Sequence, residues 1–169
     1  NDAVRNPWSL AKMGAQWLFQ GRGPLTVGAG QVGGLVSTHL ASPGRADVLL
    51  NVMPLSVDKP GDPLHSFSGF SASVTQCRPL SRGWVRVSSV DPKVAPQIAS
   101  NYLREDHDVQ TLVAGLKLLR EIYAQPSFKH LITSDEYMPG NQASSDQALQ
   151  EFARAKGGTV FHPVAVSYT

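Results

Sequence analysis

The feature that most constrains the fold is a helical repeat of apolar residues between about positions 106 and 124 of the chain. Its apolar side chains fall on one face at a period of 3.6 residues: Val109, Leu112, Val113, Leu116, Leu119 and Tyr123. Pro126 stops the pattern. Asp106 and Asp108 put negative charge near its start, which suits the helix dipole and requires no catalytic role. A helix with such a face must bury it against another element.

Strand signals lie upstream of this helix. Residues 67–77 and 83–89 are rich in Ser, Val and aromatic residues, and the stretch 78–83 between them is typical of a turn. Residues 46–57 predict another strand, which Pro54 interrupts or places at an edge. We expect these three segments to form one antiparallel sheet packed on the apolar face of helix 106–124.

Two further helices are predicted. The first covers residues 8–20, with Pro7 near its first position and Gly21 after its end. The second covers about 145–156, where Ser144 can cap the helix and Gln147 can complete a capping box. Because strands and helices occur in separate blocks, the predicted fold class is α+β, with an antiparallel sheet flanked by helices.

Composition excludes several classes of function. Fifteen Lys and Arg residues against thirteen Asp and Glu residues give a net charge of only +2, and no basic patch suited to nucleic acid is visible. The sequence has no run of about 18 apolar residues, which is the length that a membrane-spanning helix requires. A single cysteine, Cys77, excludes an internal disulfide framework and a multi-cysteine metal site. No signal peptide is visible, so we expect a cytoplasmic protein, and both ends of the chain read as cut from something larger.

The segment Gly28–Gly33 spells G-x-G-x-x-G, the pattern of a dinucleotide-binding turn, and Asp47 stands near the position of a ribose-binding acid. The surrounding sequence does not support that function. The apolar run before it, residues 25–27, is too short for a buried parallel strand, and the glycines that follow make a poor crossover helix. We therefore interpret the segment as a glycine-rich strand or loop.

Four of the five histidines lack the paired spacing of metal ligands, and we expect solvated or capping roles for them: His39, His65, His107 and His130. Cys77 has no partner motif and no Gly-x-Ser-x-Gly turn exists, so acyl transfer is unsupported. His162 differs, because it lies in an apolar extended segment in which Pro163 restricts its backbone. A neutral imidazole there could act as a general base, but the pattern alone also fits a structural histidine.

Several motifs then occur in a fixed order: Arg78-Pro79-Leu80-Ser81-Arg82-Gly83, Asp91-Pro92, Asn101-Tyr102-Leu103 and Phe161-His162-Pro163. With these separations, the chain from Gly69 onward resembles the substrate half of the glucose–methanol–choline (GMC) flavoprotein oxidoreductases. Residues 16–25 are similar to an earlier segment of the same family, closest to choline dehydrogenase-like members. We accordingly expect a cap segment over residues 1–66 and a C-terminal GMC segment over residues 67–169.

The resemblance implies FAD as cofactor, held mostly by a Rossmann-like domain that this chain does not contain. It implies oxidation of an alcohol by hydride transfer to the flavin, with His162 as the base that removes the hydroxyl proton. Arg82 is expected to be structural. The family's second catalytic residue, His or Asn, would follow a few dozen residues later and is absent, and the residues after Pro163 depart from the family's usual Gly-Thr-Cys continuation.

The implied partners are an alcohol substrate and the remaining FAD-binding polypeptide, with self-association of the isolated chain through its uncovered surface. We expect the isolated chain to be inactive. The alternative is a non-catalytic interaction module that keeps the fold without the chemistry.

Overall fold

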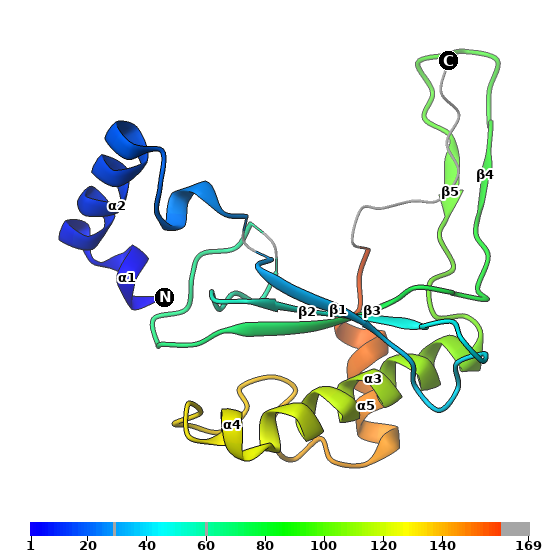
Figure 1. Cartoon of the computed structure of the whole chain (residues 1–169). Helices are drawn as coiled ribbons and strands as arrows, with labels where there is room; N and C mark the ends of the chain where they lie inside the picture. The colour runs from blue at the N-terminus through cyan, green and yellow to red at the C-terminus, as the bar shows by residue number, and fades with distance from the viewer. Residues whose placement is uncertain (29, 60, 160–169) are drawn as a thin grey trace. The chain divides into compact units, whose positions relative to one another are not determined.

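The computed structural model describes residues 1–28, 30–59 and 61–159, so His162 lies outside the described residues. The chain forms two compact units, each built from two stretches of sequence. Unit 1 consists of Asn1–Val36 and Leu49–Val74, and unit 2 consists of Ser37–Val48 and the chain from Thr75 onward. Figure 1 labels the helices and strands. The predicted boundary between residues 66 and 67 stays a prediction.

Unit 1 begins with helices α1 (Asp2–Arg5) and α2 (Pro7–Gln20), followed by a single 3-10 turn, Pro24–Thr26. The Asn6 side chain caps α2 by accepting hydrogen bonds from the backbone N–H of Trp8 and Ser9. Gly21 ends the helix with a φ of 58°, a conformation that glycine adopts without steric cost. The predicted helix 8–20 is thus confirmed, including Pro7 at its start. None of its residues is buried.

Three strands form a sheet in the order β1-β2-β3, namely β1 (Val32–Val36), β2 (Val48–Met53) and β3 (Ser71–Gln76). The predicted strands 46–57 and 67–77 contain β2 and β3, which confirms that these two segments are neighbours. The glycine-rich segment, expected to be a strand or a loop, provides β1. At its start the Gln31 N–H donates to the Val52 carbonyl oxygen at 3.2 Å.

The prediction that residues 83–89 join the same sheet is wrong. Strand β4 (Trp84–Arg86) instead pairs antiparallel with β5 (Gln97–Ala99), a strand that the sequence pattern missed. The chain leaves the first sheet after Cys77, whose N–H donates to the Asp47 carbonyl oxygen at 2.8 Å. Further along, the backbone N–H groups of Leu80 and Ser81 donate to the Asp108 side chain and are therefore not available to extend the sheet.

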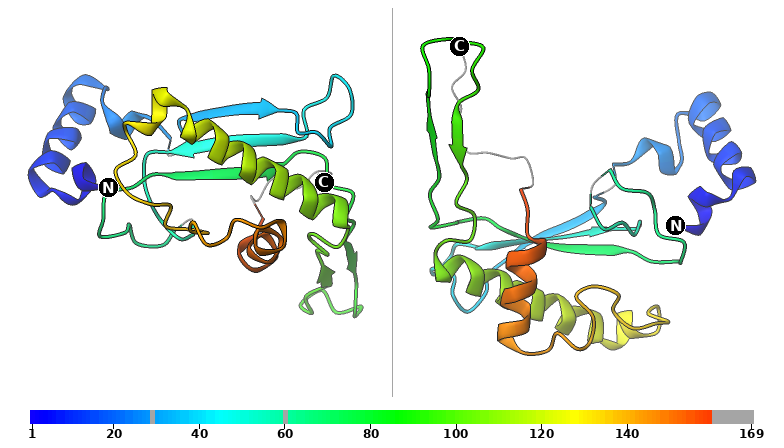
Figure 2. Two further views of the ribbon diagram at one scale, coloured as in Figure 1. Left: turned by 90° about the horizontal axis from the view of Figure 1, so that it is seen from below. Right: turned by 180° about the vertical axis from the view of Figure 1, so that it is seen from behind.

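Unit 2 contains the helices α3 (Asp106–Ala124), α4 (Pro126–Lys129) and α5 (Asp146–Lys156). The helix predicted over 106–124 is confirmed at both ends. Helices α3 and α5 pack together, as Figure 2 shows, and bury apolar side chains between them and their surroundings: Val109, Val113, Leu119, Leu149 and Ala153. This contact forms most of the core of unit 2.

The predicted cap of the last helix is off by one residue. Ser145, not Ser144, is the N-cap, and its hydroxyl oxygen accepts a hydrogen bond from the Ala148 N–H at 3.2 Å. Gln147 does not complete a capping box, because its side chain donates to Glu151 one turn along the helix. The cause is the tandem of serines at 144 and 145, either of which has the right chemistry.

Helices and antiparallel strands in separate blocks confirm the predicted α+β class. Within the described residues, no helix has both the length and the apolar character that crossing a membrane requires.

Candidate functional site

Asp108 is the most completely enclosed charged side chain among the described residues, with 0% of its surface exposed. It stands in the first turn of α3 and accepts three hydrogen bonds. Its Oδ1 accepts from Gln76 Nε2 and from the Leu80 N–H, both at 2.8 Å, and its Oδ2 accepts from the Ser81 N–H at 2.7 Å. One carboxylate thus ties the end of β3 and the following turn to the start of α3.

These bonds decide the charge state of Asp108. Burial alone would raise the pKa of its carboxyl group, but hydrogen bonds from Leu80, Ser81 and Gln76 favour the ionised form and outweigh burial. The pKa of Asp108 therefore lies below its usual value, and the group is a carboxylate at neutral pH. We call Asp108 with the Leu80 and Ser81 N–H groups the turn clamp.

The Arg78–Gly83 turn itself is held by its own arginines. Arg82 Nη1 donates to the carbonyl oxygens of Pro79 at 2.8 Å and Ser81 at 3.0 Å, which supports the structural role predicted for this residue. Arg78 Nε donates to the Ala46 carbonyl oxygen at 3.2 Å. Between them the turn is fixed by side-chain bonds rather than by a strand partner.

Cys77 precedes this turn. Partial burial raises the pKa of its thiol, and the thiol donates weakly to the Thr75 carbonyl oxygen at 3.8 Å. A raised pKa reduces the thiolate fraction, so this geometry does not activate Cys77 as a nucleophile.

Asp47, which stands near the position of a ribose-binding acid in the sequence pattern, holds the loop at Thr38 in the structure. Its Oδ1 accepts from the Thr38 N–H at 2.8 Å and its Oδ2 from the Thr38 hydroxyl at 2.6 Å. Burial would raise the pKa of Asp47, but the bonds from Thr38 outweigh it and the pKa lies below the usual value. Asp47 lines a cavity of about 200 Å³ together with Arg78 and His107.

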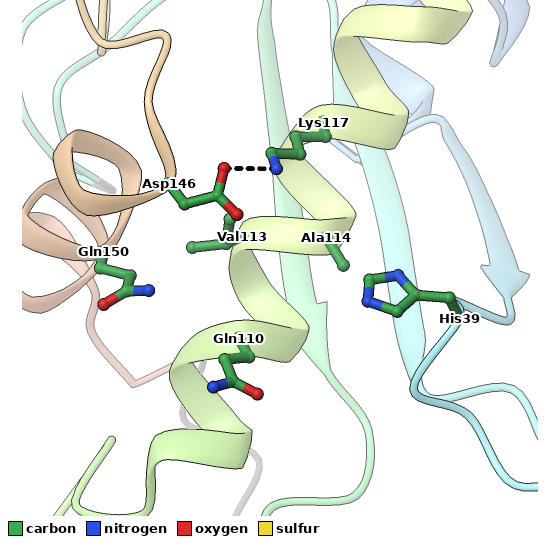
Figure 3. A pocket seen from close by; sticks show the side chains of 7 residues that line it. All are labelled: His39, Gln110, Val113, Ala114, Lys117, Asp146 and Gln150. Carbon is green, nitrogen blue, oxygen red and sulfur yellow. Dashed lines mark ion pairs between the residues drawn. The ribbon is translucent and has the colours of Figure 1, made fainter.

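A second cavity of unit 2 has a volume of about 190 Å³ and lies beside α3 and α5 (Figure 3). Lys117 and Asp146 form an ion pair across its rim at 2.5 Å. His39 approaches from the loop on the other side of Ala114 (Figure 3). The lining contains no Ser, Thr or Cys side chain, and its lysine is paired with Asp146, so we assign no chemistry to this cavity.

The other histidines considered in the sequence do not line this cavity. His65, in unit 1, contacts the Ser56 hydroxyl through Nδ1 at 2.7 Å and Asp58 through Nε2 at 3.3 Å, and its ring stacks on Phe67. His130 Nδ1 lies 3.3 Å from the Pro126 carbonyl oxygen at the end of α4. In the described part of the chain, no three His, Cys, Asp or Glu side chains gather as a metal site would require.

The structure does not bring the predicted G-x-G-x-x-G segment to a nucleotide site. Gly33 lies inside β1, and the described chain continues through a loop into the neighbouring strand β2, with no helix between them. The described residues between 25 and 52 therefore form no parallel βαβ unit, and the segment provides a glycine-rich strand, one of the two forms that the sequence predicted.

The described residues also do not fit a complete flavin site. The cavities of about 190 and 200 Å³ are smaller than the roughly 300–1,000 Å³ that drug-sized ligands need, and FAD is larger still. Among residues 1–28, 30–59 and 61–159, no glycine-rich turn leads into an α-helix N-terminus in the manner that holds a pyrophosphate. The turn clamp and the Asp47–Thr38 contact hold a turn and a loop in place, and we assign both a structural role.

The turn clamp lies within the region of the chain that matches a family of known proteins. Residues 79–166 match the family model described as GMC oxidoreductase. This match covers more than half of the chain, and the chain belongs to the GMC oxidoreductase family. The matched region starts within the clamped turn and includes α3, α5 and the position of His162.

Two bacterial proteins illustrate the similarity to curated relatives. The chain is 34% identical over 161 residues to oxygen-dependent choline dehydrogenase 1 of Chromohalobacter salexigens, and 32% identical over 158 residues to the oxygen-dependent choline dehydrogenase of Proteus mirabilis. In both cases the comparison covers 92% of this chain and 28% of the relative. The chain thus spans little more than a quarter of the length of the curated relatives it matches.

A solved structure has the same fold. A formate oxidase from Aspergillus oryzae RIB40, studied for the effect of a mutation on FAD modification, superposes with a TM-score of 0.79 and 18% sequence identity. The superposition covers 92% of this chain and 31% of that protein.

The sequence predicts only an interaction of Asp108 with the helix dipole. In the structure its carboxylate accepts three hydrogen bonds that hold the Arg78–Gly83 turn and the end of β3. A sequence signal for this role exists: Asp108 is an acid in the first turn of a helix, and the Arg-Pro-x-Ser-Arg-Gly turn upstream has backbone N–H groups that need an acceptor. His162, the predicted catalytic residue, lies outside the described residues, and its role stays a prediction.

Proposed function

We propose that this chain is the substrate region of an FAD-dependent, choline dehydrogenase-like alcohol dehydrogenase, with His162 as the base. The overall reaction moves a hydride from the CH–OH carbon of an alcohol to the flavin, which is the electron acceptor supplied by the rest of the enzyme. His162 would take the hydroxyl proton, so that the oxygen becomes negatively charged as the hydride leaves.

The observation that carries the proposal is the family match over residues 79–166, which covers the clamped turn and extends past His162. The names of the relatives support choline or a similar alcohol as substrate. They do not favour the alternative of a non-catalytic interaction module. FAD as cofactor follows from the family, and because the described residues do not fit a flavin site, we place most of its contacts in other parts of the polypeptide.

The test is His162→Ala in the complete enzyme that contains this chain. We expect the rate of flavin reduction by the alcohol to fall by roughly 10²–10⁴-fold, the usual contribution of a positioned acid–base group. Flavin absorbance of the purified enzyme should be retained, since the nucleotide contacts are placed elsewhere. Stopped-flow spectroscopy of the flavin measures both quantities.

His130→Ala is the matched control. This histidine is exposed at the end of α4 and contacts only a local carbonyl oxygen in the bonds described, so its removal should leave flavin reduction unchanged. An unchanged rate in the His162→Ala enzyme would remove His162 from the mechanism. A loss of bound flavin in that variant would instead assign the residue to cofactor binding.

A further inference from the structure

The hairpin formed by β4 and β5 has an apolar face that faces solvent. Its register places Val85 directly opposite Ile98, with Trp84 opposite Ala99 and Arg86 opposite Gln97. Side chains directly opposite each other share a face of the pair, so Val85 and Ile98 occupy one face and the other two pairs occupy the reverse. The Arg86 guanidinium lies 4.6 Å from the centre of the Trp84 ring, which agrees with this assignment.

Both members of the apolar pair are largely exposed. Val85 is 65% and Ile98 is 68% accessible, and of residues 82–100, all of which the structure describes, none is buried. Strands β4 and β5 lie side by side in Figure 1 and form a sheet of two strands. We call the Val85 and Ile98 surface the hairpin face.

The base of the hairpin is nevertheless built for one conformation. A Cβ on Gly83 would overlap the carbonyl oxygen of Ala99 and lie 2.7 Å from that of Ser100, so only glycine fits there. Asn101, at a φ of 51°, donates from its side chain to the Arg82 carbonyl oxygen at 3.1 Å. A segment with a constrained base and an uncovered apolar face fits an arm that packs on another surface.

Energetics point the same way. An isolated two-stranded hairpin is marginally stable in water at best, and strands this short gain little from their own cross-strand pairs. The hairpin also lies wholly inside the region that matches the GMC family model, so it belongs to the family's common architecture.

We propose that the hairpin face docks on an apolar surface of the flavin-binding part of the same enzyme. This inference rests on the function proposed above. The relatives are far longer than this chain, which spans 28% of them, so most of their polypeptide is available as the occupant. The face carries no charged side chain, whereas Arg86 and Trp84 lie on the reverse, so the chemistry of the occupant is apolar.

The experiment inserts the full 169-residue chain into the Chromohalobacter salexigens choline dehydrogenase in place of the matching region. Hydrogen–deuterium exchange of the amides of residues 84–99 is compared between this chimera and the isolated chain. We expect exchange to slow by about tenfold or more in the chimera, because covered hydrogen-bonded amides open less often. The flavin absorbance of the chimera is measured in the same samples.

Two variants locate the docking face. The double variant Val85→Lys/Ile98→Lys should abolish the slowing in the chimera, because it places charge in an apolar contact. Gln97→Lys, one residue away on the reverse face, should retain the slowing. Both variants should melt at the same temperature as the parent sequence in the isolated chain, since all three side chains are exposed there.

The outcomes separate the two proposals. Bound flavin with fast hairpin exchange would overturn the docking inference and leave the proposed function standing. Slow exchange without bound flavin would support docking and contradict the proposed function. Slow exchange that appears in the isolated chain and grows with its concentration would identify a second copy as the occupant, which also overturns the inference. Fast hairpin exchange together with the absence of bound flavin in the chimera would contradict both the docking inference and the proposed function.

Discussion

Replacing Asp108 by Asn tests whether the turn clamp stabilises unit 2. Asparagine has the same shape but offers one acceptor oxygen in place of two. If that oxygen keeps the bonds from Gln76 and Leu80, the new NH₂ group faces the Ser81 N–H, and two donors meet in a buried site. The substitution therefore breaks one bond and weakens the other two.

The magnitude follows from these contacts. A buried N–H without a partner costs about 1–3 kcal/mol, and changing two charge-assisted bonds into neutral ones costs about 1 kcal/mol each. Removing a buried charge recovers part of its desolvation cost, which lowers the expected total to about 2–4 kcal/mol. Because domains of this size are stable by only about 5–15 kcal/mol, the loss is easily measured.

Urea unfolding of the isolated chain, followed by circular dichroism of the helices, measures the free energy of unfolding. Asp106→Asn is the matched control: this carboxylate lies two residues earlier, its side chain is 89% exposed, and it pairs with Arg154 at 3.3 Å. An exposed pair of this kind contributes about 0–1 kcal/mol. If both variants unfold at the same urea concentration, the carboxylate of Asp108 does not hold the turn.

The difference in unfolding free energy between the parent chain and the Asp108→Asn variant has a defined pH dependence. The folded-state pKa of Asp108 is lowered, so its contribution is fully present above the unfolded value of about 3.9 and is lost as the pH falls through the lower folded value. We expect the stability gap between the parent chain and Asp108→Asn to be constant near neutral pH and to close in acid below about pH 4. A gap that widened in acid would contradict the assigned charge state.

Three further outcomes are expected of the isolated chain. Ser145→Ala should lower its free energy of unfolding by about 1 kcal/mol through loss of the bond from Ala148, whereas Ser144→Ala should have no effect; urea unfolding compares the two. Gly83→Ala should disrupt the hairpin, because its new methyl group would overlap the Ala99 carbonyl oxygen, and the loss of the β4–β5 cross-strand contacts in NMR spectra would report it. Titration with FAD should give no stoichiometric uptake and no alcohol-dependent dye reduction; turnover above a protein-free blank would show that the chain acts alone.

The elements that the sequence predicted correctly are those whose signals are local. Helix α3 has its apolar period, its acidic first turn and a proline after its end within one continuous stretch, so both bounds could be read directly. Helix α2 likewise has Pro7 and Gly21 at its two ends. The predicted N-cap of α5 is wrong by one residue because two serines are adjacent, and the choice between them depends on backbone geometry.

Strand partners could not be read in the same way. The alternation of residues in a strand shows which side is apolar but does not say which strand lies next to it. Strand β5 is three residues long and follows Pro96, which hid its pairing with β4. The prediction that residues 83–89 join the first sheet is wrong because the turn between β3 and this segment donates its Leu80 and Ser81 N–H groups to Asp108.

The network around that carboxylate also links the helix to the hairpin. Ser81 donates its N–H to Asp108, and its hydroxyl oxygen accepts from the N–H of Glu105, the residue before α3. One residue further along, the Arg82 carbonyl oxygen accepts from Asn101 at the end of the hairpin. The start of α3 and the base of the hairpin are therefore fixed by the same short turn. Local bonding of this kind gives the Arg-Pro-x-Ser-Arg-Gly motif a structural reason: it sets the direction in which the hairpin face points, while the chemistry proposed for His162 lies elsewhere in the family region.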